Sequence, residues 1–87
     1  MTSLETTCKR LLWRATHRGI KEMDILVGGY AARHLGTMSE SELQHFEILL
    51  EIPDQDLLAW ATKQEAVPSR YQSTMLTEIL AFRPETP

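Results

Sequence analysis

Residues 17–24 read His-Arg-Gly-Ile-Lys-Glu-Met-Asp and separate two helix-like segments of the chain. Apolar residues recur every three to four positions before this stretch and again after it, which is typical of amphipathic helices. Gly19 tolerates the left-handed backbone conformation in which many helices end, and glycine is also accepted where a helix begins. The stretch therefore predicts a corner between two helices, with charged side chains on both sides of the glycine.

Residues that typically begin or end helices predict three further helices elsewhere in the chain. Capping residues, glycines and prolines divide the chain into five helical pieces: one from the Thr2–Glu5 capping box to Gly19, one from Ile20 to Gly36, one from the Ser39–Glu42 capping box to Pro53, one capped by Asp54 and ending at residues 63–65, and one opened by Pro68 and closed by Pro84. No strand pair is evident. The expected fold is all-α, a compact five-helix bundle that forms one helical domain over residues 1–87.

One apolar face of each predicted helix supplies the core. These faces are formed by Leu4, Cys8, Leu11 and Ala15; by Met23, Leu26, Val27, Tyr30, Ala31 and His34; by Leu43, Phe46, Leu49 and Leu50; by Leu57, Trp60 and Ala61; and by Tyr71, Met75, Ile79 and Phe82. Gly28 and Gly29 interrupt the second helix at a cost of about 2 kcal/mol relative to alanines. Either the packing there is unusually close or the helix bends.

Length and composition argue against an enzyme. A chain of 87 residues buries one modest core and has little interior volume for a deep substrate pocket. Cys8 is the single cysteine and has no second soft ligand, and the three histidines lack the spacing of a helical metal pair. No phosphate loop, dinucleotide-binding pattern or nucleophile with its base is present. We therefore predict no catalytic, cofactor-binding or metal-binding residues.

The charge is unevenly distributed along the chain. Residues 1–22 carry five basic and two acidic side chains, whereas residues 23–87 carry four basic and ten acidic ones, for a total of -3. An acidic protein without an aromatic-interleaved basic face is not expected to bind nucleic acid. No stretch approaches the ~20 apolar residues that cross a bilayer, and the N-terminus lacks the apolar run of a secretion signal. These features predict a cytoplasmic protein with no membrane span.

The charged corner is the best candidate for a binding site. Arg18 and Glu22 are four residues apart, but a cation before an anion is the less favourable order for a helix ion pair, and Gly19 lies between them. The dipole of the second helix accounts for Glu22 in its first turn. Arg18 has no such role, so we expect its guanidinium to contact a partner's carboxylate or phosphate. The predicted partner-binding site consists of Arg18, Gly19 and Glu22, and Lys21 and Asp24 extend it.

The corner also resembles a known signature. The run from Arg18 to Glu22 is similar to the Arg-Gly-x-x-Glu motif of the succinate dehydrogenase assembly factor family, also called flavinators. Further similarity to that family lies in residues 9–13, 22–24, 49–51, 53–54 and 56–60, so the resemblance covers about residues 9–82. The chain departs from the family at His17, where a second basic residue is common, and at Gly28, Gly29 and Ala31, where bulkier residues are common.

The resemblance implies a non-enzymatic helper. Such a protein binds the flavoprotein subunit of succinate dehydrogenase and promotes covalent attachment of FAD to a histidine of that subunit, and some family members also serve fumarate reductase. FAD is then the cofactor of the client, and the helper has no cofactor of its own. We expect it to be a monomer when free. The alternative interpretation is a generic helical protein-protein adaptor for another client.

Overall fold

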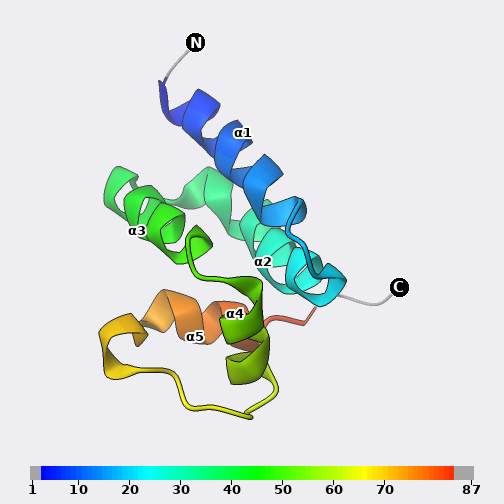
Figure 1. The fold of residues 1–87 in the computed structure, drawn as a ribbon. Helices are drawn as coiled ribbons and strands as arrows, with labels where there is room; N and C mark the ends of the chain where they lie inside the picture. The colour runs from blue at the N-terminus through cyan, green and yellow to red at the C-terminus, as the bar shows by residue number, and fades with distance from the viewer. Residues whose placement is uncertain (1–2, 84–87) are drawn as a thin grey trace.

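The computed structural model describes residues 3–83. It contains five α-helices, shown in Figure 1: α1 (Ser3–Thr16), α2 (Lys21–His34), α3 (Glu40–Leu50), α4 (Asp54–Ala61) and α5 (Thr74–Ala81). Two 3₁₀ helices, η1 (Leu35–Thr37) and η2 (Ser69–Tyr71), lie in connecting segments. The part of the chain described here has no β-strand, so the predicted all-α fold of five helices is confirmed.

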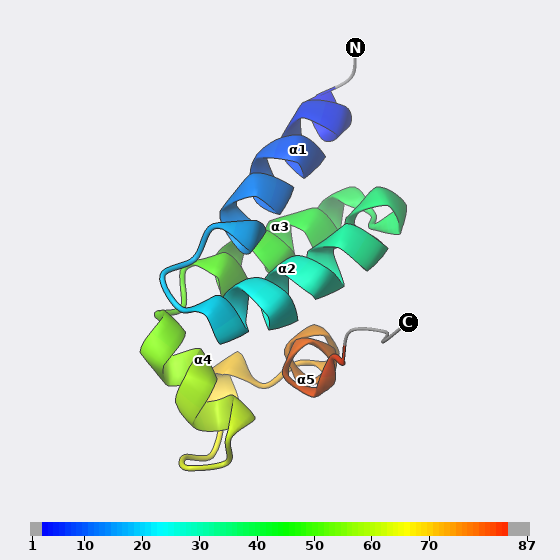
Figure 2. The same cartoon turned by 90° about the vertical axis from the view of Figure 1, so that its right-hand side faces the viewer.

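The central helix is α2, which contacts α1 on one side and α4 and α5 on the other (Figure 2). The Cα radius of gyration is 12.6 Å, close to the value of about 12 Å expected for this length. The side chains that the helices bury form one cluster: Leu11, Ala15, Met23, Val27, Tyr30, Ala31, Leu35, Leu43, Phe46, Leu49, Leu50, Ile52, Leu57, Trp60, Leu76 and Ile79. Most predicted core positions are in this cluster. Leu4 is instead 43% exposed, because the first turn of α1 projects beyond the other helices (Figure 1).

Close packing explains the glycine pair of α2, and the helix is continuous from Lys21 to His34. A Cβ atom on Gly28 would lie 2.8 Å from Cγ2 of Thr16 and 3.1 Å from the carbonyl oxygen of Ala15. A Cβ atom on Gly29 would lie 2.5 Å from the ring of Phe82. All three distances are shorter than ordinary contacts, so the two glycines let α1 and the residue after α5 approach the backbone of α2.

Several predicted boundaries are wrong. Pro68 does not open the fifth helix but precedes η2, and α5 begins six residues later, where Ser73 caps it. Asp54 does not cap α4, because Pro53 is the N-cap and Asp54 is the first helical residue. The Ser39–Glu42 capping box is confirmed, and α4 ends near Lys63, which has a left-handed φ of 62°. Predictions that involve Thr2 and Pro84 lie outside the described residues.

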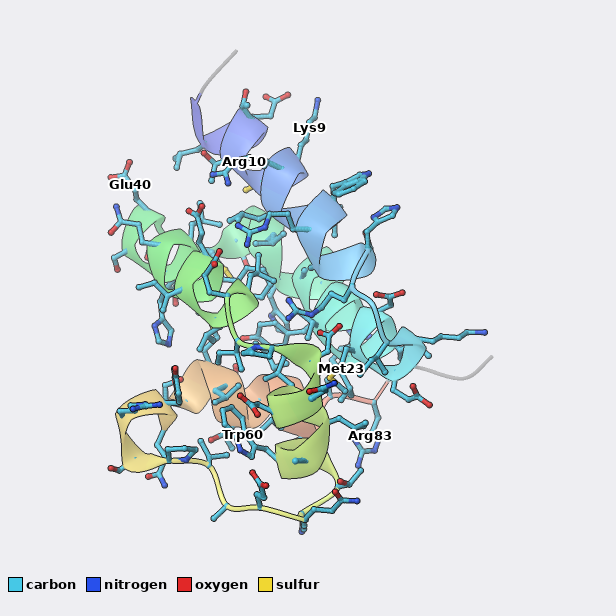
Figure 3. All side chains as sticks on the ribbon, in the orientation of Figure 1. Lys9, Arg10, Met23, Glu40, Trp60 and Arg83 are labelled. Carbon is cyan, nitrogen blue, oxygen red and sulfur yellow. The ribbon has the colours of Figure 1, made fainter. Side chains whose placement is uncertain are left out.

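Ion pairs join α1 to α3. Nη1 of Arg10 donates to Glu47 at 2.9 Å, and Nη2 of Arg14 donates to Glu51 at 2.6 Å. The hydrogen bond from Arg10 lowers the pKa of the Glu47 carboxyl below its ordinary value, with further lowering by the charges of Arg10 and Arg14. Figure 3 shows Lys9 pointing away from the body of the protein. Much of the basic charge of α1 is therefore neutralised by Glu47 of α3 and by Glu51, the residue that follows α3.

Candidate partner-binding site

The predicted corner is a short loop, residues 17–20, between α1 and α2. Ile20 is the N-cap of α2 and has an extended backbone (φ -113°, ψ 126°). Its apolar side chain makes no capping hydrogen bond to the helix. No glycine among residues 3–83 has a positive φ, so Gly19 does not adopt the left-handed conformation that it could tolerate. The conformation of this corner therefore depends on contacts with other parts of the chain.

Arg18 supplies one set of these contacts. Its Nε donates to Oδ1 of Asp54, Nη1 donates to the carbonyl oxygen of Leu50 at 3.2 Å, and Nη2 donates to that of Ile52 at 2.6 Å. The Arg18 side chain is only 9% exposed. The expectation that Arg18 has no role within the molecule is therefore wrong, because its guanidinium ties the corner to the segment between α3 and α4. Its predicted contact with a partner stays a prediction.

Asp54 completes the connection from the other side. Its Oδ2 accepts hydrogen bonds from the backbone N–H groups of Gly19 at 2.9 Å and Ile20 at 3.2 Å. Asp54 thus serves the start of α2 rather than the start of its own helix, and it does so while paired with Arg18. We call Arg18 and Asp54 the corner clamp. A charged pair with its remaining hydrogen bonds satisfied in this way holds a loop in one geometry.

Asp24 is also used within the molecule. Its Oδ1 accepts a hydrogen bond from the backbone N–H of Arg18 at 2.6 Å, and the residue is half-buried. A carboxylate in the first turn of α2 is also favoured by the helix dipole. The predicted role of Asp24 in partner binding stays a prediction, and its visible role is to hold the corner.

The outward face of the corner is formed by the three other predicted residues. Gly19, Lys21 and Glu22 are all exposed. A Cβ atom on Gly19 would meet only Oδ2 of Asp54, at an ordinary contact distance of 3.5 Å. The five predicted residues thus lie together, but Arg18 and Asp24 face inward and Gly19, Lys21 and Glu22 face the solvent.

Next to the corner lies an exposed aromatic pair that the sequence reasoning missed. Trp13 is 62% exposed, and its ring stacks on that of His17 with 4.2 Å between centroids and 10° between planes. Nδ1 of His17 is 2.8 Å from the carbonyl oxygen of Trp13. Both rings border a shallow groove of about 320 Å³ that extends to Pro53. The position of Trp13, off the apolar stripe of Leu11 and its neighbours, is the signal that could have revealed it.

Residues 3–83 contain no group of three or more histidine, cysteine, aspartate or glutamate side chains placed to hold a metal ion. Among the same residues, none of the helices has the length and apolar character required to cross a bilayer.

Sequence comparison identifies the family. The profile of the family described as "Flavinator of succinate dehydrogenase" matches residues 9–83, which include the corner, the clamp and the exposed aromatic pair. The chain belongs to this flavinator family. The resemblance predicted from the Arg-Gly-x-x-Glu motif is therefore confirmed.

Individual relatives agree with this assignment. The chain is 38% identical over 72 residues to the FAD assembly factor SdhE of Acetobacter pasteurianus, a match that covers 83% of this chain and 66% of that protein. It is 37% identical over 79 residues to the mitochondrial succinate dehydrogenase assembly factor 2 of Meyerozyma guilliermondii (87% and 58% covered). It is 32% identical over 76 residues to the protein of the same name in Dictyostelium discoideum (87% and 54%). The chain thus spans about half to two thirds of the length of these relatives.

Proposed function

We propose that this protein is a non-enzymatic assembly factor that binds the flavoprotein subunit of succinate dehydrogenase and promotes covalent attachment of FAD to it. The proposal includes the flavoprotein of fumarate reductase as a second client, a monomeric free state and a cytoplasmic location. It also holds that FAD belongs to the client and that the factor binds no cofactor of its own. Family membership supports the assignment, because the relatives carry the names of succinate dehydrogenase and FAD assembly factors.

The observation that carries the proposal is the exposed face of the corner, whose backbone is held by hydrogen bonds. Gly19, Lys21 and Glu22 are exposed, while the hydrogen bonds of Arg18 and Asp54 hold the backbone beneath them. A surface that is ordered before binding loses less conformational entropy when a partner docks. The small exposed glycine also lets a partner's backbone approach the corner closely.

A binding protein without a nucleophile can accelerate this reaction by selecting one conformer of its client. Each ~1.4 kcal/mol of preferential binding raises the population of that conformer about tenfold relative to its competitor. If the selected conformer holds the client's histidine and the flavin ring within reaction distance, the gain is a proximity effect. In this scheme the client supplies every reacting group, and the flavinator supplies only differential affinity.

The test is Gly19→Arg. Because Gly19 is exposed and has no positive φ, an arginine there can extend into the solvent with little effect on the fold, but it would occupy the space that a docked partner needs. The purified apo-subunit of the flavoprotein is mixed with FAD and the flavinator, and covalent flavin is measured by in-gel fluorescence after denaturation. We expect Gly19→Arg to reduce the stimulated fluorescence to that of a sample without flavinator.

The matched control is Gly36→Arg. Gly36 is also exposed, and a Cβ atom added there would have no neighbour within 4 Å. It lies in η1, beyond the other end of α2, so Gly36→Arg should stimulate as wild type does. Circular dichroism establishes that both variants are folded. Wild-type stimulation by Gly19→Arg would exclude the corner as the contact surface, and capture of a different client with no flavoprotein bound would favour the adaptor alternative.

A further inference from the structure

The motif glutamate lies on the rim of an apolar groove on the side of α2 that faces α4 and α5. The groove has a volume of about 260 Å³ and is lined by residues of all three helices. Leu26, Leu58 and Leu80, all half-buried, contribute apolar surface, and Ile25, which is 43% exposed, stands at the open side next to Glu22. An apolar surface that is left open beside a charged rim is typical of an interaction site.

The rim carries one charge of each sign. Glu22 lies at the α2 edge, and Arg83 lies just after the end of α5. Figure 3 shows Arg83 near the far end of α4, below Met23 of α2, which also lines the groove. Within residues 3–83, neither Glu22 nor Arg83 forms an ion pair, whereas several charges of α1 and α3 are paired with each other. Nη1 of Arg83 donates to the carbonyl oxygen of Phe82 at 2.9 Å, which leaves its positive charge without a described counter-ion. Both rim charges can therefore pair with charges of an incoming segment.

We propose that this groove receives a segment of the client flavoprotein subunit with a defined charge pattern. The segment places a bulky apolar side chain against Leu26 and Leu58, a cation against Glu22 and an anion against Arg83. The inference rests on the proposed function and deepens it, because it assigns Glu22 a partner chemistry and adds a surface outside the motif. A groove of this volume holds one or two apolar side chains, which suits an inserted segment better than the broad contact of about 800 Å² per partner in a stable dimer.

The experiment compares Ile25→Glu with Ile48→Glu. Both isoleucines are exposed, at 43% and 61%, but Ile48 belongs to α3 and does not line the groove. The affinity of each variant for the apo-subunit is measured by titration, together with covalent flavin and the oligomeric state of the free protein. We expect Ile25→Glu to weaken binding at least about tenfold, because a carboxylate would be desolvated against an apolar side chain. Ile25→Ala should weaken it by about threefold, and Ile48→Glu should bind as wild type does.

The possible outcomes distinguish failure of the groove proposal from failure of the proposed function. If Ile25→Glu is folded and binds the subunit with wild-type affinity, the groove proposal is overturned while the proposed function stands. If the wild-type protein neither binds the subunit nor raises covalent flavin, both are overturned. If Ile25→Glu dissociates a dimer of the free protein without changing client affinity, a second copy occupies the groove and the proposal is wrong. If Ile25→Glu fails to fold, Ile25→Ala decides, and wild-type affinity for it overturns the proposal.

Discussion

Arg18 and Glu22 belong to the same short motif, yet the structure uses them in opposite ways. The guanidinium of Arg18 is 9% exposed and is bound to Asp54 and two backbone carbonyls. Glu22, one helical turn further on, is exposed and lies on the rim of a groove. One charge therefore stabilises the fold of the corner, and the other is presented to whatever docks there.

This difference shows that residues of one signature need not share one role. A motif that recognises a partner has to include residues that contact the partner and residues that hold those contacts in place. Here Arg18, Asp24 and Asp54 hold the backbone, and Gly19, Lys21 and Glu22 form the surface. Substitutions on the two sides should therefore differ in whether stability or binding is lost first.

The largest effect is expected from Arg18→Ala. The substitution leaves the Asp54 carboxylate, which is 15% exposed, without its cation and removes the donors to two backbone carbonyls. Breaking such a nearly buried pair by removing one partner costs about 3–5 kcal/mol. Urea denaturation should show this loss as a lower midpoint with an unchanged slope. Arg18→Lys should recover part of the stability, because it restores the charge but not the fork of donors.

A double-mutant cycle with Asp54→Asn makes this prediction sharper. If Arg18 and Asp54 act as one clamp, the two substitutions together should cost clearly less than the sum of their separate costs. Additive costs, or a stability loss below about 1 kcal/mol for Arg18→Ala, would mean that the guanidinium contributes little to the corner. The interpretation of Arg18 as a residue that stabilises the corner would then be wrong.

The helices were largely predictable from the sequence, whereas the clamp was not. Helical spacing of apolar residues, the Ser39–Glu42 capping box and Pro53 each act over a few neighbouring residues, and such local signals located α1 to α4. The bonds between Arg18 and Asp54 join residues 36 positions apart. Nothing in the local pattern indicates such a pairing, and the sequence alone therefore favours an unpaired Arg18 and an Asp54 that caps its own helix.

Other differences have the same physical origin. The glycine pair of α2 left two explanations open, because the close neighbours of Gly28 are on α1 and that of Gly29 is Phe82, beyond α5. Pro68 is compatible with a first helical turn, but the chain instead forms η2 and leaves the cap of α5 to Ser73. The predicted corner itself was correctly placed, because it depends on a local break between two amphipathic segments.

A smaller effect, on binding rather than stability, is expected from Glu22→Gln. In the proposed complex Glu22 faces a cation of the client, and glutamine keeps the acceptor oxygen but loses the charge, so affinity for the apo-subunit should fall about tenfold. Stability should change by less than about 1 kcal/mol, because only the interaction with the helix dipole is weakened. Isothermal titration and urea denaturation measure the two quantities.

Glu40→Gln is the matched control, since Glu40 is also exposed and lies in the first turn of α3. It should lose a similar small amount of stability and bind the client normally. A Glu22→Gln variant that binds with wild-type affinity would show that the outward half of the motif does not use its negative charge.

The smallest effect is expected at Glu47, a surface carboxylate that is paired within the molecule. The hydrogen bond from Arg10 lowers its pKa in the folded protein, so its contribution to stability is present above the unfolded pKa of about 4.3 and is lost as the pH falls through the folded value. The difference in urea midpoint between wild type and Glu47→Gln should therefore be largest near neutral pH, disappear in the acid range and shrink with added salt. A difference that is constant with pH would mean that the Arg10–Glu47 contact does not stabilise the folded protein. Glu47 would then contribute no more to stability than a surface carboxylate without an ion pair.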